Sequence, residues 1–302
     1  MIILKLESGL GNQLFQYAFA RYLQKEYHET LYIDTRKLKK GQYGLKFFEL
    51  NNNVRFLNLF LQYCLSIYTK LLWLLLKKIN KSAYTTKEGA IQLSEWGWYY
   101  SYYETLFNYV DFKKTNYPVK IVSGFYQSAS FFENAKIEVL NDLKFKGVLI
   151  NPNIIDLARE ISSVESVCVH IRRGDYLSPN VSEIFHVCTE EYYQKGLDYV
   201  RSLFPNSVFY VFSNTSHDIQ WIQTHYQFPE GVEYVNMNNT GIDDFYLMSL
   251  CRHFVISNST FSWWAAYLSK NENKIVVAPR PWVKKDYEYE GIYCKGWKVI
   301  DV

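Results

Sequence analysis

Residues 165–179, with the sequence ESVCVHIRRGDYLSP, join a run of apolar residues to a cluster of charged ones. The apolar run predicts a buried strand, and His170, Arg172, Arg173 and Asp175 come where that strand ends. Guanidinium groups are planar and permanently charged, and they bind phosphate through paired hydrogen bonds. This pattern therefore indicates an anion-binding site, for which a phosphate group is the best-matched ligand.

A second polar segment, residues 256–264 with the sequence ISNSTFSWW, follows another predicted strand. Ser259 and Thr260 stand at the start of the next predicted helix, where free N–H groups and the helix dipole favour anions. Alone, such a segment is an ordinary helix cap, and adjacent arginines are ordinary surface charge. Ligands of parallel sheets bind beyond the carboxyl ends of the strands, so we expect both segments to form one pyrophosphate site.

The first half of the chain contains a glycine-rich turn. Residues 9–12, GLGN, separate a predicted strand at 1–6 from a predicted helix at 13–27. The turn falls short of the G-x-G-x-x-G dinucleotide pattern. We expect it to approach a ligand from a separate domain.

Two adjacent acids, Asp243 and Asp244, raise the question of a metal ion. Adjacent carboxylates can hold a metal that bridges a nucleotide diphosphate. Here they open a predicted helix, where the dipole favours acids in any case. Because Arg172 and Arg173 supply positive charge for phosphate, we expect a site without a metal. The sequence contains no H-E-x-x-H motif, Walker A motif or serine nucleophile elbow.

Strands and helices alternate along most of the chain, which predicts βαβ units, parallel sheets and an α/β fold. Beyond the strand at 1–6 and the helix at 13–27, the first half predicts a strand at 30–34, a strand and turn at 119–128 and a helix at 131–143. The second half predicts strands at 166–171, 207–213, 232–236, 253–258 and 274–279. Its predicted helices are 189–203, 216–226, 241–251 and 260–270. A length of 302 residues suits two domains.

The composition favours a globular protein and argues against several other classes. Hydrophobic residues make up 48% of the chain and charged residues 21%, the balance of a globular protein. The net charge is +3 and no long basic block occurs, which argues against a nucleic-acid binder. The five cysteines are widely spaced, which argues against a disulfide framework or a zinc site. The N-terminal residues do not resemble a secretory leader, so we expect a reducing, cytoplasmic location.

Residues 56–79 form an apolar stretch interrupted by Asn58, Gln62 and Lys70. A membrane-spanning helix needs about 20 apolar residues with few or no charges. We expect a helix that faces the core or a partner. The alternative is peripheral contact with a membrane, through an apolar face with a basic edge.

Five segments occur in the order in which family 11 glycosyltransferases carry them, and they span nearly the whole chain. They are GLGNQLFQYAFARYL (9–23), GFYQSASFF (124–132), VHIRRGDY (169–176), FSN (212–214) and DDFYLMSLCRHFVISNSTFSWWAAYL (243–268). The chain therefore resembles this family, and within it the α-1,2-fucosyltransferases of bacteria and animals.

The resemblance implies a GT-B architecture, in which two Rossmann-like domains with parallel sheets face each other across a cleft. We expect residues 1–147 to form the acceptor-side domain and 148–302 the domain that binds GDP-fucose. The implied reaction moves L-fucose from GDP-β-L-fucose to the 2-hydroxyl of a terminal galactose, with inversion and with neither metal nor cofactor. The alternatives are another linkage or acceptor, or a nucleotide-sugar-binding module without catalysis.

The resemblance also implies roles for single residues. Arg172 grips the β-phosphate and stabilises the departing GDP, Asn12 faces the fucose and the acceptor, and Arg173 orients the loop, paired with Asp175. The implied catalytic residues are Arg172, Asn12 and Asp175. The implied donor-binding residues are Gly11, His170, Arg173, Ser213, Asp244, Ser259, Thr260 and Phe261.

Two points stay open at the level of sequence. Asp175, Glu183 and His186 are all placed to accept the proton of the acceptor hydroxyl, and loss of that proton through water or phosphate is a further alternative. Residues 38–106 carry none of the family motifs, and we expect acceptor specificity there. A galactose-terminated glycan, free or lipid-linked, is the expected partner; no oligomeric state is predicted.

Overall fold

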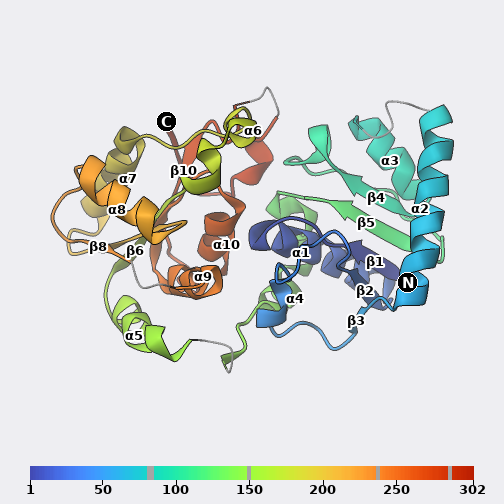
Figure 1. Cartoon of the computed structure of the whole chain (residues 1–302), viewed down its shortest axis with the longest axis horizontal. Helices are drawn as coiled ribbons and strands as arrows, with labels where there is room; N and C mark the ends of the chain where they lie inside the picture. The colour runs from blue at the N-terminus through green and yellow to red at the C-terminus, as the bar shows by residue number, and fades with distance from the viewer. Residues whose placement is uncertain (80–84, 148–150, 236–238, 285–287) are drawn as a thin grey trace. The chain divides into compact units, whose positions relative to one another are not determined.

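The computed structural model describes residues 1–79, 85–147, 151–235, 239–284 and 288–302. The chain divides into two compact units (Figure 1). Unit 1 comprises Met1–Lys144 and Tyr287–Cys294, and unit 2 comprises Phe145–Asp286 and Lys295–Val302.

The assignment of all residues from 148 onward to the second domain is wrong for one segment, because Tyr287–Cys294 belongs to unit 1. Hydrogen bonds attach this segment there. Asn108 Nδ2 donates to the Glu288 carbonyl oxygen at 2.7 Å, and Gly291 N donates to Asn108 Oδ1 at 3.3 Å. Partners 180 and 183 residues apart in the chain leave no local signal in the sequence.

Unit 1 is built on a five-stranded sheet in the order β3-β2-β1-β5-β4, with every pairing parallel. Its strands are β1 (Ile2–Lys5), β2 (Leu31–Asp34), β3 (Val54–Phe56), β4 (Trp98–Ser101) and β5 (Lys120–Gly124). Its α-helices are α1 (Leu10–Tyr27), α2 (Leu59–Ile79), α3 (Lys87–Glu95) and α4 (Lys136–Asp142). Helices α2 and α3 pack on the sheet face that bears Ile3 and Ile121, and α1 lies on the opposite face (Figure 1).

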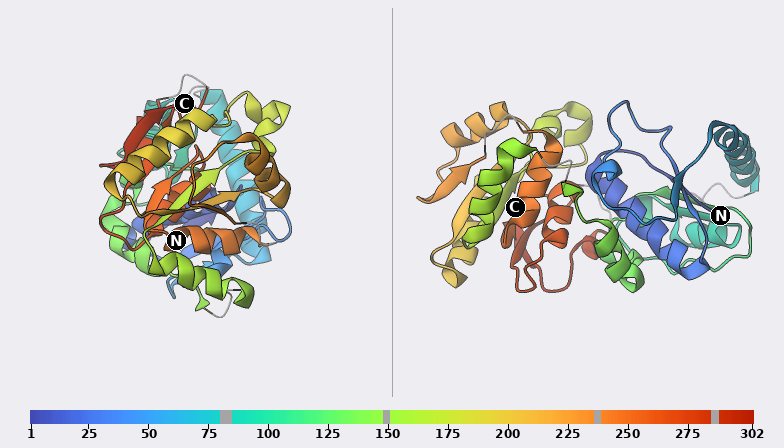
Figure 2. Two further views of the ribbon diagram at one scale, coloured as in Figure 1. Left: turned by 90° about the vertical axis from the view of Figure 1, so that its left-hand side faces the viewer. Right: turned by 90° about the horizontal axis from the view of Figure 1, so that it is seen from below.

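Unit 2 is built on a six-stranded sheet in the order β11-β10-β9-β6-β7-β8, again with every pairing parallel. Its strands are β6 (Ser166–Ile171), β7 (Val208–Ser213), β8 (Val232–Tyr234), β9 (His253–Val255), β10 (Val276–Arg280) and β11 (Lys298–Asp301). Its α-helices are α5 (Ile155–Ser163), α6 (Pro179–Ser182), α7 (Glu190–Leu203), α8 (Ser216–His225), α9 (Gly241–Leu250) and α10 (Thr260–Leu268). Helices cover both faces of this sheet (Figure 2).

The core of unit 2 explains why the central strand β6 is buried at every position. Val167, Val169 and Ile171 of β6 pack against the buried faces of α7 and α8. Cys168 and His170 point to the other face and are buried as well. A parallel sheet covered on both faces needs such continuous apolar strands. The prediction of two α/β domains with parallel sheets is confirmed.

Two predicted boundaries in unit 1 are wrong. Helix α1 begins at Leu10, so Gly11 and Asn12 lie in its first turn rather than in a turn before it. The helix predicted at 131–143 is broken into two 3-10 turns, Ala129–Phe131 and Glu133–Ala135, followed by the short α4. Phe131 and Phe132 are both fully buried. Neighbouring side chains of a regular helix point about 100° apart, so one continuous helix does not readily bury both rings. Burying both Phe131 and Phe132 therefore favours the broken backbone over the locally predicted helix.

The apolar stretch 56–79 forms α2, and part of it faces the core, as predicted. Leu57, just before the helix, and Leu65 within it are buried in a cluster that includes Trp98 and Ile121. The rest of the helix surface is considered below. None of the helices in the parts of the chain that the structure describes is long and apolar enough to cross a membrane.

Candidate active site

The carboxyl edge of the unit 2 sheet brings the two predicted anion-binding segments together. His170, near the end of β6, is buried, and its Nδ1 lies 2.8 Å from Ser257 Oγ. Tyr176 OH donates to the Asn258 carbonyl oxygen at 2.8 Å. These contacts join the HIRRGDY segment to the residues just before α10, although 82 positions separate Tyr176 from Asn258.

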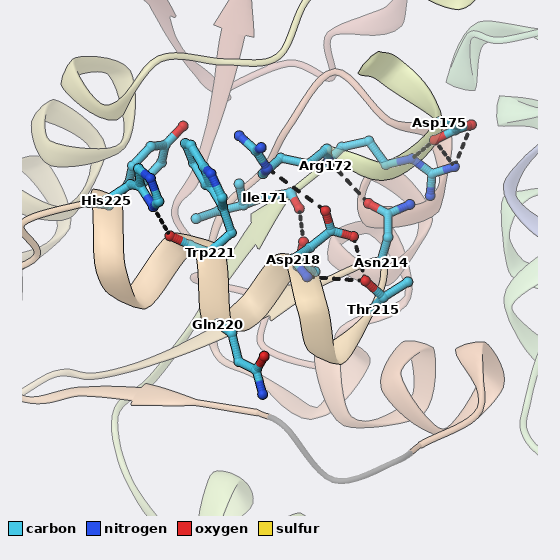
Figure 3. Close-up of polar contacts among 12 residues, drawn as sticks. Ile171, Arg172, Asp175, Asn214, Thr215, Asp218, Gln220, Trp221 and His225 are labelled. Carbon is cyan, nitrogen blue, oxygen red and sulfur yellow. Dashed lines mark hydrogen bonds and ion pairs between the residues drawn. The ribbon is translucent and has the colours of Figure 1, made fainter. Parts of the chain in front are cut away.

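Arg172 forms a bidentate ion pair with Asp175. Its Nε and Nη2 donate to the two carboxylate oxygens at 2.9 and 3.0 Å (Figure 3). The guanidinium also lies 5.5 Å from the centre of the Tyr176 ring. Both side chains are accessible to solvent, so the pair adds little to stability. It does hold the guanidinium in the geometry that suits two oxygens of a phosphate.

Arg173 is bound differently from Arg172, and the prediction that it pairs with Asp175 is wrong. Its guanidinium stacks on Trp221 of α8, with the central carbon 3.2 Å from the ring centre. Its Nε lies 3.8 Å from Asp218 Oδ1, and its backbone N–H donates to Asn214 Oδ1 at 3.1 Å. Figure 3 shows Asp218 and Trp221 on the helix that follows β7. Arg173 therefore attaches the turn to α8 and leaves Arg172 as the more exposed guanidinium.

Ser213 and the start of α10 complete this edge. Ser213 Oγ donates to the Ile171 carbonyl oxygen at 2.7 Å, which fixes the end of β7 to the end of β6. Ser259 caps α10, and its side chain accepts a hydrogen bond from Phe261 N at 3.3 Å. Thr260 is the first residue of the helix, and the Phe261 ring centre lies 5.9 Å from that of His170. The helix start thus lies beside the end of β6, where its N–H groups favour an anion.

Burial keeps His170 uncharged. Burial, and secondarily the positive charge of Arg172, lower the pKa of His170 to about 3. The imidazole is therefore neutral at physiological pH and acts as a hydrogen-bonding group rather than as a cation.

Asp243 and Asp244 at the start of α9 have separate roles. Asp243 caps the helix by accepting hydrogen bonds from the Thr240 backbone and side chain at 2.9 and 2.7 Å. Asp244 accepts from Asn239 Nδ2 at 2.9 Å, and burial raises its pKa to about 6. Among the described residues, no group of three or more His, Cys, Asp or Glu side chains is arranged to hold a metal ion.

The raised pKa of Asp244 predicts a pH-dependent stability. Folded protein keeps the Asp244 proton up to about pH 6, whereas an unfolded aspartate loses it near pH 4, so ionised Asp244 costs stability as the pH rises through 6. The free energy of unfolding of Asp244→Asn should match that of the wild type below about pH 4 and exceed it by about 3 kcal/mol above about pH 7. Urea unfolding at both pH values measures this difference in the free energy of unfolding.

Asp243→Asn is the matched control, because loss of its capping contacts should destabilise the protein at both pH values. An effect of Asp244→Asn that does not depend on pH would contradict the prediction.

The predicted site residues of unit 1 lie at the carboxyl edge of its own sheet. Asn12 Nδ2 donates to Ser8 Oγ at 2.8 Å, and Gln127 Nε2 donates to Asn12 Oδ1 at 2.7 Å. Gly11 is buried beside Asn12 in the first turn of α1. The Asn12 side chain is thus held from both sides, although Ser8 and Gln127 lie in different segments of the unit.

Three residues that lie close to the predicted site residues were not singled out at the level of sequence. Asp218 and Trp221 hold Arg173 from a helix about 45 residues downstream, and no sequence spacing predicts that contact. Glu7, two residues after the end of β1, accepts hydrogen bonds from Tyr102 OH and from Lys37 Nζ, the latter at 2.8 Å. Its position directly after a buried strand is a signal that could have singled it out.

The candidates for a general base differ in their surroundings. The Asp175 carboxylate is already paired with Arg172. Glu183 is exposed, and burial lowers the pKa of His186, which keeps its imidazole neutral.

The comparisons with known proteins identify the family. The model of glycosyl transferase family 11 matches residues 1–301. The chain belongs to this family. It is therefore a glycosyltransferase, and the resemblance drawn from the five motifs is confirmed.

Two bacterial relatives align with almost the whole chain. An alpha-1,2-colitosyltransferase from Escherichia coli is 31% identical over 297 residues, which cover 95% of this chain and 93% of the relative. The O-antigen biosynthesis glycosyltransferase WbnK from Escherichia coli is 27% identical and covers 92% of this chain and 93% of WbnK. A galactoside 2-alpha-L-fucosyltransferase from Caenorhabditis elegans is 33% identical over a shorter region, 44% of this chain and 39% of the relative.

Among solved structures, the fucosyltransferase NodZ from Bradyrhizobium has the same fold. The TM-score is 0.53 and the identity 16%, over 88% of this chain and 92% of NodZ. At this identity the similarity establishes the fold alone. This family 11 protein thus consists of two Rossmann-like domains of the GT-B type.

Proposed function

We propose that this glycosyltransferase moves L-fucose from GDP-β-L-fucose to the 2-hydroxyl of a terminal galactose, forming an α-1,2 linkage with inversion and without a metal ion. One observation carries the proposal: Arg172 stands at the carboxyl edge of the unit 2 sheet beside the start of α10. The proposal makes unit 2 the donor-binding domain and unit 1 the acceptor-side domain.

The proposed chemistry depends on stabilising the leaving group. The sugar passes through an oxocarbenium-like state while negative charge builds on the departing GDP. Preorganised donors aimed at developing charge are usually the largest catalytic contribution. Arg172 supplies a fork of two N–H donors, and the start of α10 supplies the backbone N–H of Thr260 together with the positive end of the helix dipole. His170 is neutral and therefore adds no charge of its own to the site.

Asp175 is proposed to orient Arg172 rather than to accept the proton. Its two oxygens occupy the same two donors that a diphosphate would need, so it keeps the fork aligned until the donor binds. Arg173 acts through the backbone, since its side chain is held by Trp221 and Asp218. In unit 1, Asn12 is proposed to hold the acceptor or the fucose through its fixed amide.

A second donor is favoured by one relative. The alpha-1,2-colitosyltransferase is 31% identical over nearly the full chain. Colitose is L-fucose without its 3-hydroxyl, so the same diphosphate site would serve either donor. The α-1,2 linkage is supported by the names of both this relative and the animal ones, whereas the choice between donors depends on contacts to a single hydroxyl.

The acceptor is proposed to be a galactose-terminated bacterial surface glycan, because WbnK is described as an O-antigen biosynthesis enzyme. A cytoplasmic location is proposed on the basis of the cysteines. Cys64, Cys168, Cys188 and Cys251 are free, and the last three are buried, as expected in a reducing compartment.

Incubation with lactose and either GDP-fucose or GDP-colitose, with and without EDTA, tests the proposal. We expect fucosyl transfer to the galactose 2-hydroxyl that EDTA does not reduce. Transfer from GDP-colitose alone would select the second donor, and loss of turnover in EDTA would refute the metal-free reaction. Tight GDP binding with neither transfer nor donor hydrolysis would show a binding module without catalysis.

A further inference from the structure

Helix α2 exposes a stripe of large apolar side chains. Phe60 is 74% exposed, Tyr63 66% and Leu71 56%, and Ile67 and Leu74 are also exposed. Positions 60, 63, 67, 71 and 74 recur at three- and four-residue intervals, so they lie on one face of the helix. Contiguous exposed apolar surface of this kind marks an interaction site in a soluble protein.

The stripe is not the face by which α2 joins unit 1. Leu65 and Thr69 are buried, and Leu65 packs with Leu93 and Ile121 against the sheet. Positions 65 and 69 are about half a turn of helix away from 60, 67 and 71. The opposite face is occupied by the domain core, so the exposed stripe faces away from unit 1. Figure 1 shows α2 along the surface of unit 1.

The segment of the sequence that contains the stripe carries charge of one sign. Residues 50–87 contain six basic residues and no aspartate or glutamate, whereas the whole chain has 33 basic and 30 acidic residues. The six are Arg55, Lys70, Lys77, Lys78, Lys81 and Lys87. Lys70 is exposed within the described part of α2. An acid-free basic segment is attracted to a negatively charged surface.

We propose that α2 binds the surface of an anionic lipid bilayer, with the stripe between the headgroups and the acyl chains. An apolar face flanked by lysines is the pattern of interfacial helices, and each lysine adds attraction to anionic lipid. A second copy of the chain would bring an equally basic, acid-free segment to the stripe, and the like charges would repel. This inference does not depend on the proposed sugar donor or acceptor.

Cys64 provides a probe at the stripe. It is the exposed cysteine of α2, while Cys168, Cys188 and Cys251 are buried. A polarity-sensitive fluorophore on Cys64 should shift to shorter wavelength when the protein meets vesicles of phosphatidylcholine and phosphatidylglycerol. It should shift much less with phosphatidylcholine alone, and added salt should reverse the binding. The control is Cys64→Ser combined with Ile137→Cys, which moves the dye to an exposed apolar position on α4 and should report no shift.

Variants of the stripe test the contact itself. Phe60→Ser combined with Leu71→Ser should lower the vesicle partition coefficient by at least about tenfold, because two large apolar side chains no longer enter the bilayer. Lys70→Glu should lower it by about tenfold on anionic vesicles and have little effect on neutral ones. Ile137→Ser, which removes an equally exposed apolar side chain elsewhere, should leave it unchanged.

Thermal melting checks that the variants are folded, and sedimentation measures vesicle binding and oligomeric state. The variants alter only exposed side chains, so their melting temperatures should equal that of the wild type. The proposal is overturned if the wild type does not bind anionic vesicles. It is equally overturned if the wild type forms a dimer that Phe60→Ser with Leu71→Ser dissociates, because the stripe would then bind a second copy.

Discussion

Arg172→Lys should lower kcat by a hundredfold to a thousandfold, which corresponds to about 2.7–4 kcal/mol of lost transition-state stabilisation. Arg172 presents two N–H donors to a pair of oxygens, as its contact with Asp175 shows. Lysine keeps the positive charge but offers a single ammonium group in place of the planar fork. The loss should appear in kcat more than in the affinity for GDP, because the charge on the leaving group develops in the transition state. Steady-state transfer assays and calorimetry with GDP measure the two quantities.

Three further variants test whether the loss of turnover is specific to Arg172. Arg159→Lys changes an exposed arginine of α5 in the same unit and should have no effect. Arg173→Lys should weaken the stack on Trp221 and lower the melting temperature as well as turnover. Asp175→Asn should keep kcat within about tenfold of the wild-type value, because Asp175 orients Arg172 and does not accept the proton. Near-normal turnover in Arg172→Lys, with strong loss in Arg173→Lys alone, would mean that the other arginine takes the charge.

The alternation of elements in unit 2 could be predicted from sequence because each signal there is local. The buried strand β6 is mostly apolar, and Thr189 caps α7 by accepting a hydrogen bond from Tyr192 N at 3.3 Å. The carboxyl edge of a parallel sheet is then fixed by topology, which is why His170 and Ser257 could be expected to meet.

Contacts between segments that are distant in the chain could not be predicted from the sequence. Arg173 and Asp175 are two residues apart and of opposite charge, yet Arg173 turns to Trp221 and Asp218 on α8. Stacking on an aromatic face and partial burial outweigh an exposed ion pair, which contributes about 0–1 kcal/mol. The broken helix at 131–143 has the same kind of cause, since burial of both Phe131 and Phe132 is a property of the assembled core.

Gly124→Ala should destabilise unit 1 by about 3 kcal/mol or more and lower its melting temperature by roughly 10 °C. Gly124 ends β5 with a φ of +131°, which residues with a side chain rarely adopt. A Cβ there would overlap the carbonyl oxygen of Ser101 and lie 2.7 Å from the Ser101 nitrogen. Ser101 is the register partner of Gly124 in β4, so neither strand can move without breaking the pairing.

The same substitution should also disturb the unit 1 site. Three residues after Gly124, Gln127 donates from its backbone to the Leu106 carbonyl oxygen and from its side chain to Asn12, both at 2.7 Å. Displacing this segment would release the Asn12 amide, so turnover should fall even below the melting temperature. Gly9→Ala is the matched control, because Gly9 has a φ of −75° and no atom within 4 Å of an added Cβ. It should cost less than about 1 kcal/mol. Equal melting of the two variants would show that the close approach of β5 to β4 does not require a glycine.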